Sequence, residues 1–532
     1  MFMITFDALT LKAFVQENLK FLEGSRIQKI QQPTRRDFVF NLRNSGESKK
    51  LYININPQIY HVCFMEKDNE LKRRIEIPSK PPMFCMLLRK HLENSKISRV
   101  NVPENERILE FYIETYDELN EKIHLCLAIE LMGKHSNVIL YNYDTNIILG
   151  CAHNVGAEKS REREVAGTLP YAYPPRQIKN DIRNYNGGID YKSLSNDFYL
   201  FSNSFANMCS GKTLDELKNF VMLTNISPAI SPDYAVYSLY EELLPEAVLQ
   251  KDVNSMIDSY YAYHQANEKF NSLYNNLKTI IKQKLKRTLA TIEKMYSQIK
   301  REANSEKYRL WGDLIMTNLY NSKDYSEKIC VYDYENNKNI EIELDSSKTL
   351  KDNANRFYKL YTKGKTSKQK LSELLEEMNS IKMNLEQMDY FLDNAETYDD
   401  LLDVMIEIVD TQSPKEKAVI KAQEPERIDK GEFVIYIGKN NKQNDYIVSK
   451  LAKNDDLWFH TKDCPGSHVL LRGQSPTDEL IYECAKLAKQ FSAGKLSSKV
   501  GVIYTKSKYL RKPPKAALGY VTYKNEREIV VD

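Results

Sequence analysis

The sequence predicts a multidomain α+β protein, and three observations carry this prediction. The chain has 532 residues, which at roughly 100–200 residues per domain is enough for several domains. Short segments with alternating apolar and polar residues occur near both ends and are typical of strands. Two long segments between them repeat apolar residues every three or four positions, which is typical of long helices. We therefore expect an amino-terminal mixed α/β domain, a small helical connector, a long antiparallel coiled-coil arm with a small tip module, and a carboxy-terminal α/β domain.

Turn residues and composition place the domain boundaries. Pro174 and Pro175 end the first domain, because proline cannot continue a sheet. The expected divisions are an amino-terminal domain at 1–175, a helical connector at 176–250, the arm at 251–410 with its tip module at 311–366, a linker at 411–427 and a carboxy-terminal domain at 428–532.

Period-two alternation and helix signals predict individual elements in both terminal domains. In the first domain we expect strands at 36–43, 50–55, 107–113 and 123–129, and a helix from Pro82 to Leu92. In the last domain we expect strands at 432–437, 457–460, 499–504 and 519–523, and a helix at 477–491. In the connector we expect helices at 214–223 and 232–244, either as a plain helical connector or as a helix-hairpin-helix around 225–228.

The two long helical segments, 251–310 and 367–410, carry opposite charge. Residues 278–310 hold ten Lys/Arg and three Asp/Glu, a net charge of +7, whereas residues 371–410 hold one Lys and twelve Asp/Glu, a net charge of −11. Opposite charges beside an apolar seam favour pairing of these helices with each other. The alternative is that both are unrelated amphipathic helices on a core.

Several classes of protein are excluded by what the sequence lacks. No run of about 18 apolar residues is present, and the start of the chain does not resemble a signal peptide. The eight cysteines lie at least 20 residues apart and form no CxxC pair, so we expect no structural zinc. Neither a Walker loop nor an HExxH motif occurs. We expect no metal, no cofactor and no enzymatic machinery.

The carboxy-terminal domain contains a basic tract that suggests nucleic-acid binding. Nine Lys/Arg and no acidic residue lie between Cys484 and Lys515, beside Tyr504 and Tyr509. Uncompensated cations with aromatic neighbours are typical of surfaces that contact phosphates and stack bases. We expect Lys495, Lys499 and Lys508 to contact RNA.

Two further polar segments are candidates for binding. The segment from Trp458 to Val469 presents His460, Lys462 and His468 around a Pro-Gly turn, which we interpret as recognition residues. In the first domain, the segment from Glu130 to Asn137 joins two strands and contains Lys134 and His135. Together with Glu106, Arg107 and the helix end at Arg89 and Lys90 it is expected to form a mostly cationic patch, with a plain structural ion pair as the alternative.

These segments resemble the NFACT family along nearly the whole chain. The runs 438–446, 456–460 and 465–469 resemble its RNA-binding domain, and the runs 6–9, 24–33, 86–92 and 130–137 resemble its amino-terminal domain. The segments Trp311 to Leu314 and Asn353 to Tyr358 resemble the module between its long helices. The family's Asp-Arg pair corresponds here to Glu106 and Arg107.

The resemblance implies a cytoplasmic, ribosome-associated quality control factor. Such a factor binds large ribosomal subunits that hold peptidyl-tRNA and recruits alanyl-tRNA, and the ribosome itself adds a carboxy-terminal alanine tail that marks the chain for degradation. The resemblance implies a role in tailing for Glu106 and Arg107. Together with the patterns above, it leads us to expect tRNA contacts from Glu106, Arg107, Arg89, Lys90, Lys134 and His135, and ribosomal RNA contacts from His460, Lys462, His468, Lys495, Lys499 and Lys508. We expect a monomer when the protein is off the ribosome and no membrane partner. The alternative is a fibronectin-binding surface adhesin.

Overall fold

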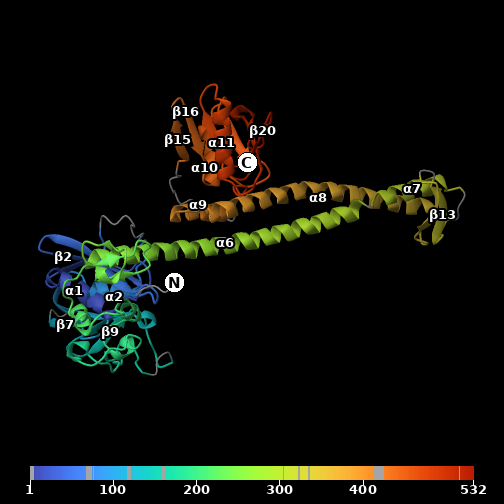
Figure 1. Ribbon diagram of the computed structural model, residues 1–532. Helices are drawn as coiled ribbons and strands as arrows, with labels where there is room; N and C mark the ends of the chain where they lie inside the picture. The colour runs from blue at the N-terminus through green and yellow to red at the C-terminus, as the bar shows by residue number, and fades with distance from the viewer. Residues whose placement is uncertain are drawn as a thin grey trace. The chain divides into compact units, whose positions relative to one another are not determined.

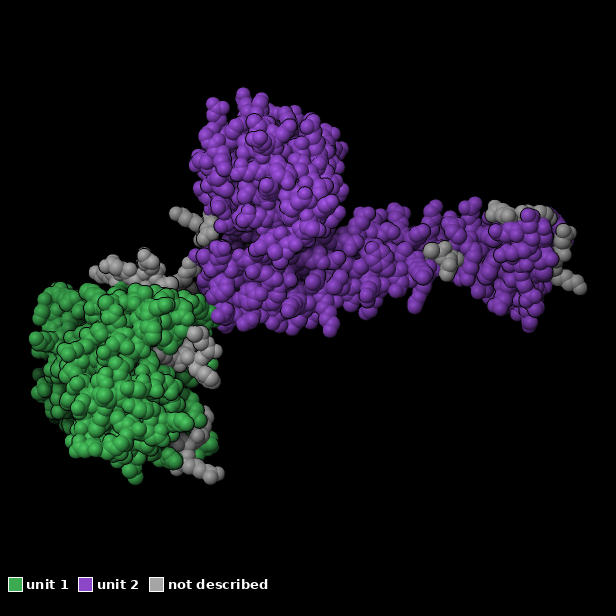
Figure 2. All heavy atoms as spheres, viewed as in Figure 1, with its two compact units in different colours: residues 1–268 green, residues 269–532 purple. Residues whose placement is uncertain are grey.

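The computed structural model describes residues 5–66, 75, 77–116, 121–158, 162–303, 305–320, 324–333, 336–410, 424–514 and 516–532. The chain forms two compact units, Met1–Glu268 and Lys269–Asp532, which Figure 2 shows in different colours. Within the described ranges, no helix has the length and apolar character needed to cross a membrane.

The first unit, which Figure 1 colours from blue to green, is built on one nine-stranded antiparallel sheet in the order β4-β3-β2-β1-β5-β6-β7-β8-β9. Its strands are β1 (Arg26–Gln31), β2 (Asp37–Asn44), β3 (Glu47–Asn54), β4 (His61–Phe64), β5 (Lys96–Asn101), β6 (Ile108–Tyr116), β7 (Lys122–Glu130), β8 (Asn137–Asn142) and β9 (Ile147–Cys151). Helices α1 (Ala8–Leu22) and α2 (Met83–Leu92) bury apolar residues in the same core as the sheet. The strand pairs predicted at 36–55 and 107–129 and the helix predicted at 82–92 are confirmed.

An internal repeat relates the two halves of this sheet. Residues 22–30 read LEGSRIQKI and residues 92–100 read LENSKISRV. In both copies a helix ends, a residue with positive φ follows (Gly24 at 85°, Asn94 at 67°), and a strand begins with a β-bulge. The two copies meet where β1 and β5 pair at the centre of the sheet.

The two copies exchange matching hydrogen bonds across this junction. They run from Gly24 N–H to the Ile97 carbonyl (2.8 Å), from Asn94 N–H to the Ile27 carbonyl (2.7 Å), from Val100 N–H to the Glu23 carboxylate (3.0 Å) and from Ile30 N–H to the Glu93 carboxylate (3.0 Å). Each glutamate thus satisfies a buried amide of the other copy just beyond the bulge, where the strand ladder is interrupted.

The connector residues pack into the core of the first unit. The helices are α3 (Leu194–Asp197), α4 (Asn203–Met208) and α5 (Leu214–Val221), with 3₁₀ turns at Ile182–Asn184 and Glu241–Leu243, and a small sheet contains β10 (Ala229–Ile230), β11 (Tyr237–Ser238) and β12 (Val248–Leu249). The prediction of α5 is confirmed, but a helix at 232–244 is wrong. Tyr234 has a φ of 55°, which no α-helix contains, and β11 follows it. The short helices that flank a turn are α4 and α5, and Gly211 makes that turn with a φ of 84°.

The second unit begins in a long helix. Helix α6 (Val253–Ala303) runs beside α8 (Leu350–Asp393), and α9 (Tyr398–Asp410) packs with both through Leu277, Leu385 and Leu401. Lys278 bridges Asp389 and Asp393 of α8 at 2.8 and 2.7 Å, so the predicted pairing of opposite charges exists at this end.

The apolar seam predicted along the whole arm is only partly buried in the middle, where Ile292 is 7% exposed but several other seam residues face solvent. Leu289 and Tyr296 of α6 and Leu374 and Ile381 of α8 are between 39% and 55% exposed. The helices approach again at Gly364, where an added Cβ would lie 2.6 Å from the Cβ of Ser305. The tip contains α7 (Glu306–Thr317) and the hairpin of β13 (Lys328–Asp333) and β14 (Lys338–Glu343), which share a core with the first turns of α8.

The carboxy-terminal domain is a six-stranded antiparallel sheet in the order β15-β16-β18-β17-β19-β20. Its elements are β15 (Glu426–Lys430), β16 (Phe433–Ile437), α10 (Asn441–Tyr446), a π-helical turn (Ile447–Leu451), β17 (Leu457–Thr461), β18 (Val469–Arg472), α11 (Asp478–Gln490), β19 (Val500–Lys506), a 3₁₀ turn (Ser507–Tyr509) and β20 (Arg527–Val531). The strand predicted at 519–523 is wrong, because that segment contributes only an isolated bridge between Arg511 and Thr522, and β20 is the edge strand. The linker predicted at 411–427 lies largely outside the described residues.

Side chains of the arm hold this domain in place. The Gln387 amide of α8 donates to the Gly466 carbonyl (2.5 Å) and accepts from the Gly466 N–H (3.0 Å). On α9, Asp403 accepts from Asn440 (3.0 Å) and pairs with Lys442 (3.0 Å), and Glu407 accepts from Asn441 (2.7 Å). Burial raises the pKa of Glu407 to about 7, although Asn441 and Lys442 oppose the shift.

Replacing Glu23 by alanine should destabilise the first unit by about 1–3 kcal/mol, because the buried amide of Val100 loses its acceptor. Glu23→Gln keeps an acceptor oxygen and should retain most of the stability. Scanning calorimetry of the full chain measures the effect, with Glu47→Ala on the exposed hairpin as the control. Equal losses in Glu23→Ala and Glu47→Ala would contradict the role of the exchanged carboxylate.

Docking of the carboxy-terminal domain should weaken as pH rises from about 5 to about 7. Glu407 is ordinarily ionised above 4.5, and its raised pKa means that the docked state holds a proton the released state has lost. The measurement is the protection of the Gly466 amide against hydrogen exchange, corrected for intrinsic rates. Glu407→Gln should flatten the pH dependence and the exposed control Glu376→Gln should not; a Glu407→Gln profile like the wild type would refute the assignment.

Candidate nucleic-acid interfaces

Arg107 lies immediately before β6 and is half-buried against an aromatic ring. Its Nη1 donates to the Tyr60 hydroxyl at 3.1 Å, and its guanidinium lies 6.0 Å from the centre of that ring. The Glu106 carboxylate instead lies nearest Arg176, with 4.0 Å between Oε1 and Nε. Burial raises the pKa of Glu106, and the charges of Arg176 and Arg107 oppose the shift. The two residues predicted as a pair therefore have different neighbours: Arg107 contacts Tyr60, and Glu106 lies beside Arg176.

A buried carboxylate contributes to the field around Arg107. Asp7 caps α1 and accepts from the Thr10 N–H, the Thr10 hydroxyl and the Ser202 hydroxyl, each at 2.8 Å. Burial raises the pKa of Asp7, and these hydrogen bonds and the charge of Arg107 oppose the shift. The charge of Arg107 therefore favours the ionised form of Asp7, although less than the hydrogen bonds from Thr10 and Ser202 do.

The turn at 133–135 lies beside the same aromatic ring. A Cβ built at Gly133, which has a φ of 62°, would lie 3.7 Å from the Tyr60 ring, and the Leu131 N–H donates to the Arg107 carbonyl at 2.9 Å. Lys134 and His135 are exposed on this turn. The structure therefore brings four predicted residues, Glu106, Arg107, Lys134 and His135, to the edge where β6 begins and β7 ends.

Arg89 and Lys90 lie elsewhere. The Arg89 Nε donates to the Ile30 carbonyl at 2.8 Å, beside the Glu93 carboxylate, so Arg89 belongs to the junction between the two sheet halves. Because β1 and β5 run in opposite directions from their paired residues, the Ile30 end of β1 lies away from the start of β6. We call the surface formed by Glu106, Arg107, Lys134 and His135 the Arg107 patch. The structure does not bring Arg89 and Lys90 of α2 into this patch.

Two cations beside the Arg107 patch were missed from the sequence. Arg176 faces Glu106, and the Lys179 ammonium donates to the Ser195 carbonyl at 2.6 Å. Burial and the charge of Arg107 lower the pKa of Lys179. The sequence feature that could have identified Arg176 and Lys179 is their position shortly after Pro174 and Pro175, at the start of the predicted connector.

In the carboxy-terminal domain the two histidines lie in a packed aromatic cluster. The ring of His460 is stacked on Trp458, with ring centres 5.8 Å apart, and the ring of His468 is perpendicular to both at 5.2 and 5.1 Å. Burial lowers the pKa of His460 to about 4 and also lowers the pKa of His468 well below its usual value, so both rings are neutral at pH 7. His468 is 4% exposed, and this placement does not offer it to a ligand.

The basic tract is divided by the fold. Lys495 and Lys499 precede β19, whereas Lys508 and Arg511 follow it, so a strand of seven residues, about 23 Å long, separates the two groups. All four are exposed, and none has an acidic partner in the described structure. Most other cations of the tract are not free to bind a ligand. Lys506 pairs with Asp455 (3.1 Å), Lys512 pairs with Asp445, and Lys489 is buried. Lys515 lies outside the described residues.

Lys462 is also engaged in an ion pair, since its ammonium lies 2.8 Å from the Glu528 carboxylate. In the described part of the chain, no group of three or more His, Cys, Asp or Glu side chains is arranged to hold a metal ion. Arg107 with Lys134, Lys495 with Lys499, and Lys508 with Arg511 therefore mark three separate cationic surfaces: the Arg107 patch, the Lys495 end of β19 and the Lys508 end of β19.

Comparisons with known proteins agree along the whole chain. The family model described as NFACT N-terminal and middle domains matches residues 7–211 and 211–427, and that described as NFACT protein RNA binding domain matches residues 426–525. The Rqc2 homolog RqcH of Bacillus subtilis (strain 168) is 29% identical over 571 residues, covering 99% of this chain and 98% of that protein. The Rqc2 homolog RqcH of Streptococcus suis (strain 05ZYH33) is 30% identical over 549 residues, with the same coverage.

Solved structures cover parts of the chain. The carboxy-terminal part of the fibronectin/fibrinogen-binding protein from Streptococcus suis is 29% identical, covers 49% of this chain and 94% of that chain, and has a TM-score of 0.39. The family models together match almost every residue from 7 to 525. This chain belongs to the NFACT family and contains an NFACT RNA-binding domain at residues 426–525.

Proposed function

We propose that this protein acts in ribosome-associated quality control. It binds a large ribosomal subunit that still holds peptidyl-tRNA, recruits alanyl-tRNA, and so directs the addition of a carboxy-terminal alanine tail that marks the stalled chain for degradation. The observation that carries the proposal is similarity over 99% of the chain to two proteins named Rqc2 homolog RqcH, together with the matched RNA-binding domain.

The distribution of positive charge supports different RNA ligands for the two units. In the first unit, Arg107, Lys134 and His135 share one edge with Arg176, and a planar guanidinium suits a phosphate or a base edge. We assign this patch to tRNA. In the second unit, the cations at both ends of β19 lack acidic partners, and we assign them to ribosomal RNA. The protein forms no bond itself in this proposal, because the ribosome joins the alanines.

The remaining parts of the proposal concern state and location. The protein works in the cytoplasm on the ribosome and is a monomer when it is free. The names of the solved streptococcal fragments mention fibronectin binding, and that statement concerns those proteins. We do not propose an adhesin.

Arg107→Lys should lower tRNA recovery and alanine tailing together while co-sedimentation with large subunits persists. Lysine keeps the positive charge near Asp7 but lacks the planar fork, so folding should be preserved. Tyr60→Phe, which removes the hydroxyl that holds Arg107, should have a smaller effect in the same direction. The measurements are tRNA pull-down and a tail assay on a stalled reporter.

Glu106→Asp serves as the companion of Arg107→Lys, because it restores the Asp-Arg pair expected of the family and should preserve or improve tailing. Thermal unfolding of all variants controls for folding. Wild-type tRNA recovery in Arg107→Lys and in Arg107→Ala would show that this patch is not the tRNA site, even if the large subunit still binds.

The two ends of β19 can be tested separately for RNA contacts. Lys495→Gln with Lys499→Gln, and Lys508→Gln with Arg511→Gln, should each reduce the slope of log affinity against log salt by about 1–2 units in large-subunit binding, since each lost phosphate contact removes about 0.7–0.9 units. The control is Lys462→Gln with Lys506→Gln, whose charges are already paired. A slope that is unchanged in both test variants would contradict the assignment of this domain to RNA.

A further inference from the structure

A small cavity lies where the end of α8 and the start of α9 meet the carboxy-terminal domain. Its volume is about 270 Å³. One part of its wall comes from α8, α9 and the turn between them, and the other part comes from the residues before α10, the Pro-Gly turn and the end of α11. The contacts of Gln387 with Gly466 and of Asp403 with Lys442, described above, hold these two parts together.

The apolar part of the lining is largely aromatic. Tyr390, Phe391 and Phe491 line the cavity together with Ala395 and Val404. Burial raises the pKa of Tyr390 to about 12, so its hydroxyl keeps its proton and this wall is uncharged at pH 7. Flat aromatic rings are surfaces on which nucleobases stack. The volume lies just below the roughly 300–1,000 Å³ of sites for drug-sized ligands, which suits a single base.

Two polar side chains of the lining are available to a ligand. Ser467 is only 2% exposed, and its N–H donates to the Phe491 carbonyl at 2.8 Å, but its hydroxyl makes no hydrogen bond to any described residue. The exposed amide of Gln490 likewise has no partner among the residues that the structure describes. Buried polar groups are normally hydrogen-bonded to protein or water, so the Ser467 hydroxyl indicates a site that a ligand or water completes.

The charged residues of the lining are of both signs, and two of the four are already engaged. The Asp400 carboxylate accepts from the Thr397 N–H and hydroxyl, both at 2.8 Å, at the start of α9. The Lys439 ammonium lies 2.9 Å from a carboxylate of β15. Glu396 and Lys495 are exposed and have no ion pair within the described ranges. The cavity therefore offers one carboxylate and one ammonium beside its aromatic wall.

A nucleotide matches this combination of groups. Its base presents a flat face to the aromatic rings, and its phosphate presents a negative charge to the ammonium. The exocyclic amino group of adenine or cytosine donates a hydrogen bond, which a carboxylate accepts. Uracil lacks that amino group and presents a carbonyl oxygen in its place, which a carboxylate repels.

We propose that this cavity binds one unstacked RNA base that carries an exocyclic amino group. Glu396 accepts from the amino group, the aromatic wall stacks on the base, and Lys495 contacts the adjoining phosphate. The inference deepens the proposed function and rests on it, because it adds a base contact to a domain to which we assigned only phosphate contacts. A free nucleotide offers the same chemistry, and the experiment separates the two sources.

The test compares two double variants of the full chain that carry the same chemical changes. The cavity variant is Glu396→Gln with Ser467→Ala. The control variant is Glu377→Gln with Ser497→Ala, which changes two exposed residues outside the cavity. Neither variant removes a cation, and the Ser467 hydroxyl has no protein partner to lose, so folding should be preserved. If thermal unfolding shows a loss of stability, Glu396→Gln alone replaces the cavity variant.

The readout is fluorescence anisotropy with short fluorescein-labelled oligoadenylate and oligouridylate at fixed salt. The wild type and the control should bind oligoadenylate about tenfold more tightly, a ratio expected for one base held by hydrogen bonds. The cavity variant should bind both strands within about twofold, with the salt dependence of the wild type, because no phosphate contact is lost. A preference that is absent from the wild type, or that survives in the cavity variant, would overturn the proposal.

Competition identifies the source of the nucleotide. Unlabelled oligoadenylate should displace the labelled strand at a much lower concentration than adenosine monophosphate does, because the strand adds phosphate contacts outside the cavity. Displacement by adenosine monophosphate at an equal or lower concentration would overturn the assignment to RNA, in favour of a free nucleotide.

A second measurement separates this inference from the proposed function. Co-sedimentation of the wild-type chain with large ribosomal subunits tests the proposed function without reference to the cavity. If the wild type fails to co-sediment, the proposed function fails while the base preference still decides on the cavity. If the wild type co-sediments and the cavity variant keeps the preference for oligoadenylate, only the cavity is refuted.

Discussion

The exchange of hydrogen bonds between the two copies of the Leu-Glu-Gly/Asn-Ser segment holds the first unit together. Glu23 and Glu93 each bond an amide of the other copy, so neither half of the sheet satisfies its bulge alone. This junction fixes where β1 and β5 begin, and through them the strands that follow. Arg89 bonds the same junction, which explains its burial better than a ligand contact does.

The repeat also explains why the first copy has no patch equivalent to the Arg107 patch of the second copy. An offset of 70 residues relates Glu23 to Glu93, and the same offset relates Asp37 to Arg107, each at the start of the second strand of its copy. Asp37 is enclosed by donors from Thr34 (2.6 Å), Tyr52 (2.7 Å) and Asn54 (2.9 Å). Arg107 has one hydroxyl neighbour and stays half-exposed. One copy uses this corner for internal bonding, and the other leaves a half-exposed cation there.

Sequence patterns predicted those elements whose cause is local. The alternation in β2, β3, β6 and β7 and the Pro82 start of α2 all lie within the segments that show them. Elements fixed by distant partners were missed: β11 replaces a predicted helix because Tyr237 is buried against the first core, and β20 exists only as a partner of β19. The candidate site divides in the same way. Residue types revealed the cations, but only the fold shows that Lys462 is paired and His468 buried.

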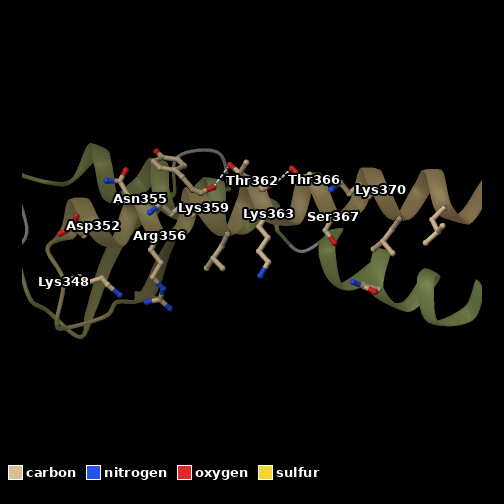
Figure 3. Close-up of a pocket in the computed structure, with 15 residues that line it drawn as sticks. Lys348, Asp352, Asn355, Arg356, Lys359, Thr362, Lys363, Thr366, Ser367 and Lys370 are labelled. Carbon is tan, nitrogen blue, oxygen red and sulfur yellow. Dashed lines mark hydrogen bonds between the residues drawn. The ribbon is translucent and has the colours of Figure 1, made fainter. Parts of the chain in front are cut away.

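The arm shows why net charge alone is an incomplete guide. Opposite totals on its two helices predict mutual neutralisation, yet direct ion pairs form near Lys278, and Arg356, Lys359 and Lys363 near the tip (Figure 3) have no carboxylate partner in the described structure. Adjacent like charges on a helix are destabilising by a few tenths of a kcal/mol per pair. Arg356, Lys359 and Lys363 incur this cost without an internal counterion, whereas acidic residues are abundant farther along the same helix. The same electrostatic reasoning applies to both ends of β19, which makes separated cationic surfaces the feature shared by the arm and the carboxy-terminal domain.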